Sequence, residues 1–340
     1  MLHGGVDIVI VSLRRKYWML RGREVVRAEL SHCFTCKRYK SRTQTQLMDD
    51  LPDCKVTPSP PFQKTGVDYA GPLSVQRSKC RRKGTLKGYI VVFVCMATKA
   101  IHLEIVEDYS TELIIAAFQR FVSRRGYCND LYNDQGTWHF NPPAAPHFSG
   151  IWESAVKSTK FYLKRVVGDQ ILTFVEFSTF LCRIEACLNS RPLCPLTDDP
   201  LDLNPLTPAH LLTLRASYFV PEHDLLAKRV SPLQRWKLIS QSVQVFWKKW
   251  SSEYLSTLQA RSKWLTPQRS MQVGDLVLIK NELTPPGKWP LGRLIEIFKD
   301  LNSLVRVVRV RTSNTVSVRP IHKLILLKTS SELIDANNLE

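Results

Sequence analysis

The sequence lacks any long hydrophobic run. A membrane-spanning helix needs about 20 consecutive apolar residues, and the most apolar segment, Tyr89–Met96, has only the length of a β-strand. Nothing in the sequence resembles a secretory leader either, because arginines and a tyrosine follow the first short apolar stretch at Arg14–Tyr17. We therefore expect no membrane partner and no export signal.

The cysteines do not form a pattern typical of disulfide-bonded proteins. There are nine, an odd number, and most are scattered along the chain. Only Cys33 and Cys36 lie close together, as a Cys-x-x-Cys pair. This usage is typical of reduced thiols, so we expect a protein of the nucleus and cytoplasm.

Acidic residues are few relative to basic ones. The 340 residues include 30 acidic and 48 basic side chains, which gives a formal net charge of +18. Such an excess favours a polyanionic partner, most commonly nucleic acid. A basic protein without such a ligand is the alternative. The hydrophobic content of 44% is enough for two or three domains with real cores.

Changes in residue pattern predict six segments. These are a small helical N-terminal domain, a proline-rich linker, an α/β core, a long connecting helix, a strand-rich basic domain and a tail: 1–48, 49–64, 65–222, 223–268, 269–328 and 329–340. In the first segment the apolar spacing predicts a helix over 6–31.

The core segment alternates strand and helix patterns. A short strand at 65–67 is expected to end at Gly71-Pro72, and the apolar run 88–97 predicts a strand buried on both faces. A third strand at 100–106 is followed by a helix over 110–125 and a strand at 131–132. This order predicts the first half of a ribonuclease-H-like mixed sheet.

The C-terminal half begins with two further helices and ends in strands. Helices are predicted over 153–167 and 173–189, and a long helix over 231–260 carries an apolar stripe at helical spacing that indicates packing. Short strands between 273 and 327 predict a small SH3-like β-barrel. Its basic surface would include Arg293, Arg309 and Arg311.

Three carboxylates stand in distinctive surroundings. Asp68 lies in GVDYAGPL, Asp134 in YNDQGT and Glu153 in APHFSGIWESAVKS. Magnesium and manganese ions prefer carboxylate oxygens, and paired ions of this kind catalyse phosphoryl transfer. The trio is therefore a candidate site for two Mg²⁺ or Mn²⁺ ions.

These motifs, together with KAIHLEIV, LNSRPL and GDLVLIKNELTPPGKWPLGRLIEI, resemble the integrases of retroelements. The resemblance is closest to the Bel/Pao group of long-terminal-repeat retrotransposons and covers nearly the whole chain. It implies that Asp68, Asp134 and Glu153 are the catalytic metal ligands. It further implies processing of the 3′ ends of element DNA, strand transfer into target DNA, action as a homo-oligomer and origin in a larger polyprotein.

Lysines follow Glu153 on one predicted helix face. Lys157, Lys160 and Lys164 lie four, seven and eleven positions later. Lysines there can neutralise DNA phosphates, and the first two match lysines that contact the DNA end in the family. A solvated charged face is the alternative interpretation.

A zinc site is a second candidate. The family carries an N-terminal His-His-Cys-Cys domain, and His3, Cys33 and Cys36 match three of its ligands. The first histidine has no match, and His32 is a poor substitute because it directly precedes Cys33. A site without zinc is the alternative.

The interval between the second and third carboxylates is short. Eighteen residues separate Asp134 from Glu153, against 65 between Asp68 and Asp134, whereas the family inserts a helix and a strand there. Enzymatic activity is therefore an open question. The competing hypotheses are an active integrase, a non-catalytic nucleic-acid-binding relic or host-adopted DNA-binding scaffold, and a ribonuclease H.

Overall fold

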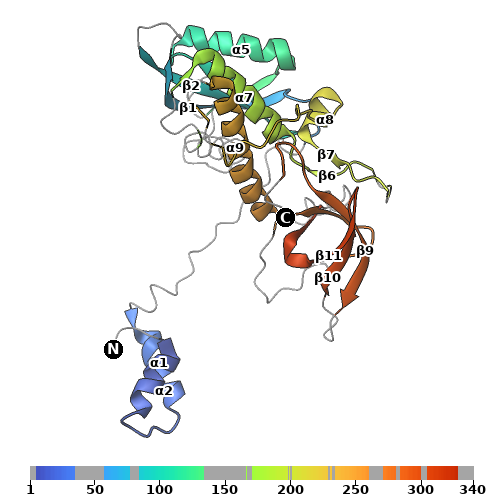
Figure 1. Ribbon diagram of the computed structural model, residues 1–340. Helices are drawn as coiled ribbons and strands as arrows, with labels where there is room; N and C mark the ends of the chain where they lie inside the picture. Colours follow the sequence, from blue (N-terminus) through green and yellow to red (C-terminus); the bar gives the residue numbers. More distant parts are fainter. Residues whose placement is uncertain are drawn as a thin grey trace. The chain divides into compact units, whose positions relative to one another are not determined.

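The computed structural model describes most of the chain (Figure 1). The described residues are 5–34, 57–76, 84–133, 166, 171–197, 199, 201–228, 230–231, 234–259, 271–280, 284–299 and 305–327. The chain forms two compact units, Met1–Leu51 and Pro52–Glu340. Within the described residues, no helix combines the length and the apolar character that crossing a membrane requires.

The N-terminal unit contains a pair of short helices, α1 (Gly5–Arg14) and α2 (Gly22–His32). The single helix predicted over 6–31 is therefore wrong, because the chain turns before α2 and Arg21 adopts a left-handed conformation with φ of 53°. Ile10 and Val26 are buried in this pair. Arg23 and Asp7 form an exposed ion pair of 2.9 Å that links the helices.

The larger unit is built on a mixed sheet. Its described strands are β1 (Lys64–Gln76), β2 (Thr85–Cys95), β3 (Ile101–Val106), β4 (Asp130–Tyr132) and β5 (Leu172–Thr173). The order is β3-β2-β1-β4, and β5 also pairs with β1. The first three strands are antiparallel, whereas β4 and β5 run parallel to β1. The mixed α/β fold predicted from the sequence is confirmed.

Strand β1 is longer than its sequence suggests. We expected a short strand ending at Gly71-Pro72, but β1 continues to Gln76 with a register shift between Ala70 and Leu73. The irregularity absorbs the proline, which cannot donate a hydrogen bond within a ladder. The proline-rich segment before β1 also contributes to the core, since Phe62 is only 1% exposed.

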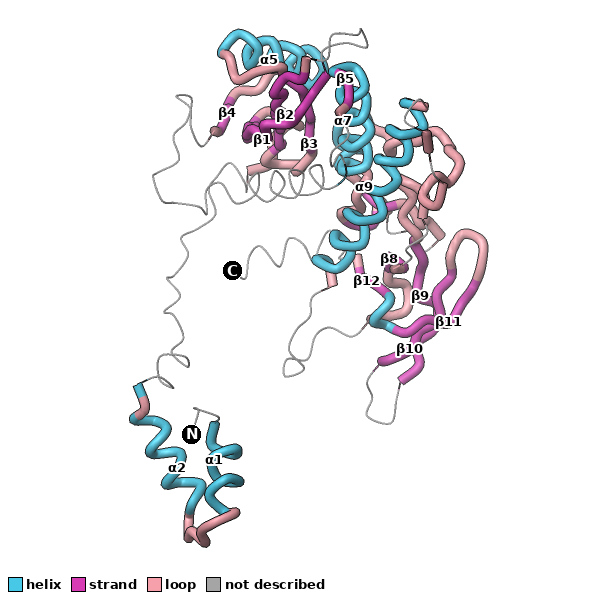
Figure 2. Tube along the Cα trace, turned by 60° about the vertical axis from the view of Figure 1, so that its left-hand side comes forward, coloured by secondary structure: helices cyan, strands magenta, loops and turns pink. Residues whose placement is uncertain are grey.

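The central strand β2 separates two hydrophobic layers. Ile90, Val92 and Val94 face one layer, and Val91 and Phe93 face the other. The second layer is covered by α5 (Thr111–Arg125) and the first by α7 (Phe174–Asn189) and α9 (Arg235–Leu258). Figure 2 shows the strands between α5 and α7. Burial on both faces explains why the sequence of β2 is almost continuously apolar.

The long helix α9 packs against the core as its stripe predicted. Ile239, Val243, Phe246 and Trp250 are all buried, although Trp236 at the start of the stripe is 59% exposed. The helix begins at Arg235 rather than at Ser231. Between α7 and α9 lie β6 (Cys194–Pro195), β7 (Pro205–Leu206) and α8 (Pro208–Thr213).

The C-terminal strands form an antiparallel sheet in the order β11-β10-β9-β8-β12. Its elements are β8 (Leu276–Ile279), β9 (Leu291–Lys299), β10 (Val305–Arg311), β11 (Val316–Pro320), the 3₁₀ helix η1 (Ile321–Lys323) and β12 (Leu324–Leu326). Each strand falls within a strand-rich stretch predicted from the sequence. Leu276 and Leu278 pack with Leu255 of α9, and Val277 and Ile279 face the other side of the sheet.

Aromatic side chains join this sheet to α9 and the core. Trp289 lies edge-on to Trp247 at 4.8 Å between ring centroids and is within 5.8 Å of Trp250. The Trp289 indole donates to Ser190 Oγ at the end of α7 (3.3 Å), and the Tyr254 hydroxyl donates to the Pro192 carbonyl (3.2 Å). These contacts tie three elements together at one place.

Candidate functional site

Asp68 lies in the middle of β1, on the face that α7 and α9 cover. Its partner across the antiparallel pair is Val92, which belongs to that layer. The neighbours Val67 and Tyr69 point into the opposite layer. The Asp68 side chain is half-buried, and its Oδ1 accepts a hydrogen bond from the Tyr69 amide at 2.6 Å. The carboxylate is thus oriented by its own strand.

Tyr69 forms an aromatic group on the opposite face. Its ring contacts Tyr109 at 5.0 Å between centroids, and Tyr89 contacts Tyr109 at 5.7 Å. Burial, with the neighbouring Tyr109 and Asp68 adding to it, raises the pKa of Tyr69 to about 12. The phenol is therefore neutral at physiological pH and serves as a packing group.

Strand β4 runs beside β1 toward the candidate carboxylates. Lys64 pairs with Asp130 and Gly66 with Tyr132 in the parallel register. Tyr132 packs against the same layer that Asp68 faces, so the side of β4 that carries Tyr132 is the side of β1 that carries Asp68. The description of this segment ends at Asn133, directly before Asp134.

Most of the other predicted site residues lie outside the described residues. These are the two remaining carboxylates, the three helix lysines and two of the proposed zinc ligands: Asp134, Glu153, Lys157, Lys160, Lys164, His3 and Cys36. Within the described part of the chain, no three His, Cys, Asp or Glu side chains come together as a metal-binding group. The described member of the carboxylate trio is Asp68.

Cys33 is the one candidate zinc ligand that the structure describes. It is the C-cap residue of α2 and follows His32, the last residue of that helix. The described part of the helix pair leaves several large apolar side chains exposed, including Trp18 at 90%, Leu20 at 85% and Phe34 at 78%. A small unit with so little buried surface generally requires a metal ion, disulfide or partner for stability.

The three predicted DNA-binding arginines have different surroundings. Arg293 is only 7% exposed, and its guanidinium donates to the carbonyls of Gly274, Asp199 and Asp202. It therefore joins β9 to the loop between β6 and β7 and is not available to DNA in this structure. Arg309 forms an ion pair with Glu296 and lies over the Phe298 ring. Arg311 is half-buried on the same strand.

Sequence reasoning missed a buried charge cluster at the β3 edge. His102 contacts Glu104 through Nε2 at 3.2 Å and Glu185 of α7 through Nδ1 at 3.1 Å. Three arginines of α5 surround these carboxylates: Arg120 and Arg124 contact Glu104 at 2.8 and 2.9 Å, and Arg125 pairs with Glu185. Arg125 Nε also lies 3.4 Å from His102 Nδ1, farther away than the Glu185 carboxylate.

The cluster favours a charged imidazole. Burial by itself lowers the pKa of His102, but its hydrogen bonds to Glu104 and Glu185 outweigh that effect, so the pKa is raised. Burial likewise opposes ionisation of Glu104, while His102 and Arg120 reverse it and lower the pKa of that carboxyl. Both shifts favour the charged forms of the two residues.

The same side chains close the exposed edge of the sheet. Asn189 of α7 accepts from the Ile101 amide at 2.9 Å and donates to the Ile101 carbonyl at 2.8 Å. Glu185 accepts from the Leu103 amide at 2.9 Å. Arg120 donates to the Ile105 carbonyl at 3.3 Å. Side chains thus make hydrogen bonds to backbone N–H and C=O groups that an edge strand would otherwise present to another chain.

One protein-family model matches the C-terminal part of the chain. Residues 234–327 match the model of a family of unknown function (DUF5641). This range begins at the N-cap of α9 and ends just after β12, so it contains α9 and the C-terminal sheet. No curated protein matches the chain.

Among solved structures, the chain is similar to a chain in the cryo-EM structure of the simian T-cell lymphotropic virus intasome in complex with PP2A regulatory subunit B56 gamma. The sequence identity is 11%, the TM-score is 0.36, and the match covers 96% of each chain.

Proposed function

We propose that this chain is an integrase-type polynucleotidyl transferase that binds DNA and joins its 3′ ends to target DNA. In this proposal Asp68, Asp134 and Glu153 hold two Mg²⁺ or Mn²⁺ ions. The expectation comes from the sequence motifs, and the described strands around Asp68 support it.

The observation that carries the proposal is the parallel register of β1 and β4. Asp68 lies two residues beyond Gly66, and Asp134 lies two residues beyond its partner Tyr132. A continuation of the same register would bring the two aspartates side by side. Since positions two apart on a strand share a face, both carboxylates would then project from the same side of the sheet.

The donor set fits hard divalent cations. Three carboxylates offer oxygen ligands, which Mg²⁺ and Mn²⁺ prefer. When bound, such ions activate the attacking hydroxyl and stabilise the leaving oxygen of the phosphodiester. The contribution of the chain would be to orient the carboxylates, and Asp68 is already fixed by the hydrogen bond from the Tyr69 amide.

Charge supports DNA as the substrate. The net charge of +18 favours a polyanion, and Lys157, Lys160 and Lys164 would neutralise phosphates beside Glu153. On β10, Arg309 and Arg311 remain candidates for DNA contacts, whereas the buried Arg293 is withdrawn from that role.

The finer domain assignments belong to the same proposal. The mixed sheet with its flanking helices would be a ribonuclease-H-like core, and the C-terminal sheet, with a 3₁₀ helix before its last strand, an SH3-like barrel. The poorly buried helix pair would be completed by zinc at His3, Cys33 and Cys36 or by a second copy of the chain. Homo-oligomerisation, release from a larger polyprotein, and residence in the nucleus and cytoplasm follow from the sequence expectations alone.

The second candidate function is DNA binding without catalysis, as a relic or a host-adopted scaffold. The observation that favours it is the interval of 18 residues between Asp134 and Glu153. A lost helix would remove part of the support for the third carboxylate.

A strand-transfer assay separates the two candidates. The full chain is incubated with a labelled duplex carrying a recessed 3′ end, a supercoiled target plasmid and either Mg²⁺ or Mn²⁺. The integrase proposal expects joined products that chelation abolishes and that fall at least about a hundredfold in Asp68→Asn, since hydroxyl activation at a metal site supplies several kcal/mol.

The control is DNA affinity. Asp68→Asn removes one negative charge, so it should retain salt-sensitive binding to the same duplex. No joined product from either protein, with binding intact in both, would reject the enzyme and favour the scaffold. Loss of binding in the wild-type chain would reject both candidates.

A further inference from the structure

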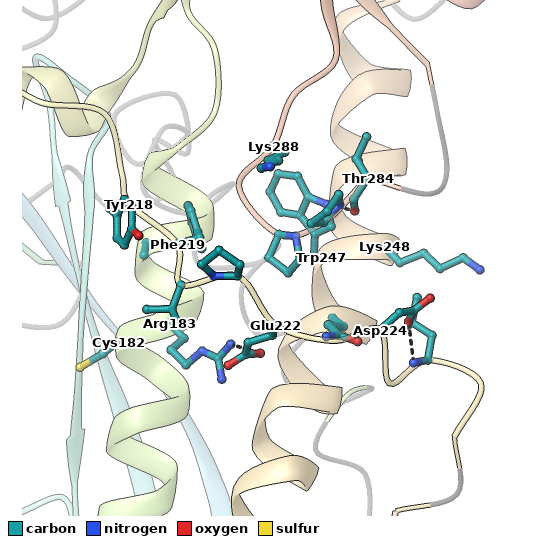
Figure 3. Close-up of a pocket in the computed structure, with 17 residues that line it drawn as sticks. Cys182, Arg183, Tyr218, Phe219, Glu222, Asp224, Trp247, Lys248, Thr284 and Lys288 are labelled. Carbon is teal, nitrogen blue, oxygen red and sulfur yellow. Dashed lines mark hydrogen bonds and ion pairs between the residues drawn. The ribbon is translucent and has the colours of Figure 1, made fainter. Parts of the chain in front are cut away.

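A cavity of about 600 Å³ lies between α7, α9 and two loops (Figure 3). Its walls come from α7 at Arg183, from α9 at Gln244 and Trp247, from residues 218–226 and from residues 284–288. The volume lies in the range of pockets that bury small ligands or anchoring side chains. None of these residues takes part in the proposed metal site.

Residues 216–224, which we call the strap, form one wall without helix or strand. Side chains of neighbouring elements nevertheless hold it. Glu222 pairs with Arg183 at 2.8 Å, and Gln244 donates to the His223 carbonyl at 2.9 Å. Gln244 also accepts from the Leu225 amide, just past the strap, at 2.9 Å. The strap is therefore held in place by α7 and α9.

The opposite wall fits closely against the strap. Gly287 has a φ of +74°, and a Cβ at that position would lie 1.9 Å from the Phe219 ring, so only glycine can occupy it. The Trp247 indole donates to the Thr284 carbonyl at 2.9 Å and fixes the same loop to α9. Both walls are thus positioned before any ligand arrives.

The strap presents apolar side chains and open backbone groups at the mouth of the cavity. Tyr218 is 83% exposed and Val220 is 73% exposed, although both are large and apolar enough to favour burial. Within the described chain, the main-chain groups of residues 216–221 make no hydrogen bond. An extended peptide can pair with such groups while one of its side chains enters a neighbouring pocket.

Positive charge at the mouth is incompletely neutralised. The Arg183 guanidinium is occupied by Glu222, and Asp224 accepts from the Leu226 amide. The ammonium groups of Lys248 and Lys288 make no ion pair or hydrogen bond to any described residue. The lining contains three basic and two acidic side chains, so a net positive charge remains and favours carboxylates on the occupant.

We propose that the cavity and the strap form a docking site for an extended segment of a partner protein, with one apolar side chain in the cavity and acidic side chains against Lys248 and Lys288. A nucleic-acid strand fits less well, because it carries a phosphate at every nucleotide and needs a run of cations. The lining instead combines Tyr218, Val220 and Pro221 with two lysines and two carboxylates.

The test is selection of binders from a display library of random dodecapeptides on the full chain. Selected peptides are then measured by fluorescence anisotropy against two charge-matched double variants. Lys248→Glu/Lys288→Glu reverses the lysines of the cavity. Lys237→Glu/Lys249→Glu reverses two exposed lysines of α9 that do not line it. Circular dichroism and thermal unfolding check that both variants are folded.

The expected result is enrichment of peptides that combine an aromatic or aliphatic residue with at least a pair of carboxylates. Their affinity should fall roughly tenfold or more in the cavity variant and remain unchanged in the control variant. Val220→Ser, which alters only the apolar rim, should weaken the same peptides without changing DNA affinity.

Three results would overturn the proposal. One is a selection that yields no binders or binders without acidic residues. Another is equal loss of peptide binding in both double variants, which would indicate general electrostatic attraction. The third is a labelled single-stranded oligonucleotide whose binding falls much more in the cavity variant than in the control, because the occupant would then be nucleic acid.

Discussion

Among the described strands of the core sheet, the two at the ends of the order, β3 and β4, have different surroundings. At the β3 edge every residue from Ile101 to Val106 is buried, and side chains of α5 and α7 satisfy backbone groups and pair with charges. The three residues of β4 are half-buried, and the strand leads directly to the segment that carries Asp134. The β3 strand is covered by side chains of the protein itself, and β4 leads toward the candidate carboxylates.

Because of this difference, we expect substitutions in the two regions to affect different properties, namely folding stability and enzymatic activity. A buried charge whose partner is removed is costly, because no water replaces the lost interaction. A half-buried carboxylate such as Asp68 keeps access to solvent, so its removal should cost little stability. Substitutions at the β3 edge should therefore lower the free energy of unfolding, whereas substitutions near β4 should leave stability nearly unchanged and alter activity.

The largest effect is expected for Glu185→Ala. This change removes the partner of His102 and Arg125 and leaves the Leu103 amide without its acceptor. We expect a loss of about 3 to 5 kcal/mol in the free energy of unfolding, measured by urea denaturation. Glu107→Ala, at an exposed position just after β3, is the control and should change stability by less than about 0.5 kcal/mol. Equal effects would show that the cluster does not stabilise the edge.

A smaller effect is expected for Asn189→Ala. The Asn189 amide makes two hydrogen bonds to the backbone of Ile101, and each buried group left unsatisfied costs about 1 to 3 kcal/mol. Besides lower stability, the Ile101 amide should exchange its hydrogen faster with solvent. Asn189→Asp keeps the acceptor for that amide and should protect it better than alanine does. Unchanged exchange in the alanine variant would contradict the closed-edge interpretation.

The His102 cluster also predicts a pH dependence. The raised pKa of His102 means that the folded state holds the proton more tightly than the unfolded state, whose pKa is about 6.5. The stabilisation is therefore complete below that value and is lost as the pH rises through the higher folded pKa. The difference in urea midpoint between wild type and His102→Gln should therefore shrink as the pH is raised above the unfolded pKa of about 6.5. A constant difference would show that His102 does not titrate in this range.

The fold was largely predictable because its strongest signals are local. The continuous apolar run of β2, the α5 pattern ending before Gly126 and the α7 segment all appear as expected. The wrong predictions lie where a local sequence signal was overridden by, or did not reveal, the pairing and turns of the folded chain. Gly71-Pro72 suggested the end of a strand, yet pairing with β2 carries β1 past it. In the N-terminal unit, helical spacing did not reveal the turn at Arg21.

The site was predictable only as separate residues. Asp68 was found from its motif, but no local pattern indicated that His102 on β3 would meet Glu185 on α7, 83 positions later. The only available signals were the spacing of four residues between Arg120 and Arg124 and between Glu185 and Asn189. Arg293 was likewise predicted to lie on the surface, because the sequence does not reveal that the carbonyls of a distant loop surround its guanidinium.

The smallest stability effect is expected at Asp68, on the strand beside β4, and it tests the contrast with the β3 cluster directly. Asp68→Asn keeps an oxygen that can accept from the Tyr69 amide, so the hydrogen bond of 2.6 Å has a substitute. We expect the free energy of unfolding without added metal to change by less than about 0.5 kcal/mol. Added Mn²⁺ should raise the melting temperature of the wild type but not of the variant, because a ligand that binds only the folded state stabilises it. A large loss of stability in Asp68→Asn without metal would show that Asp68 is a structural residue, and the contrast with the β3 cluster would fail.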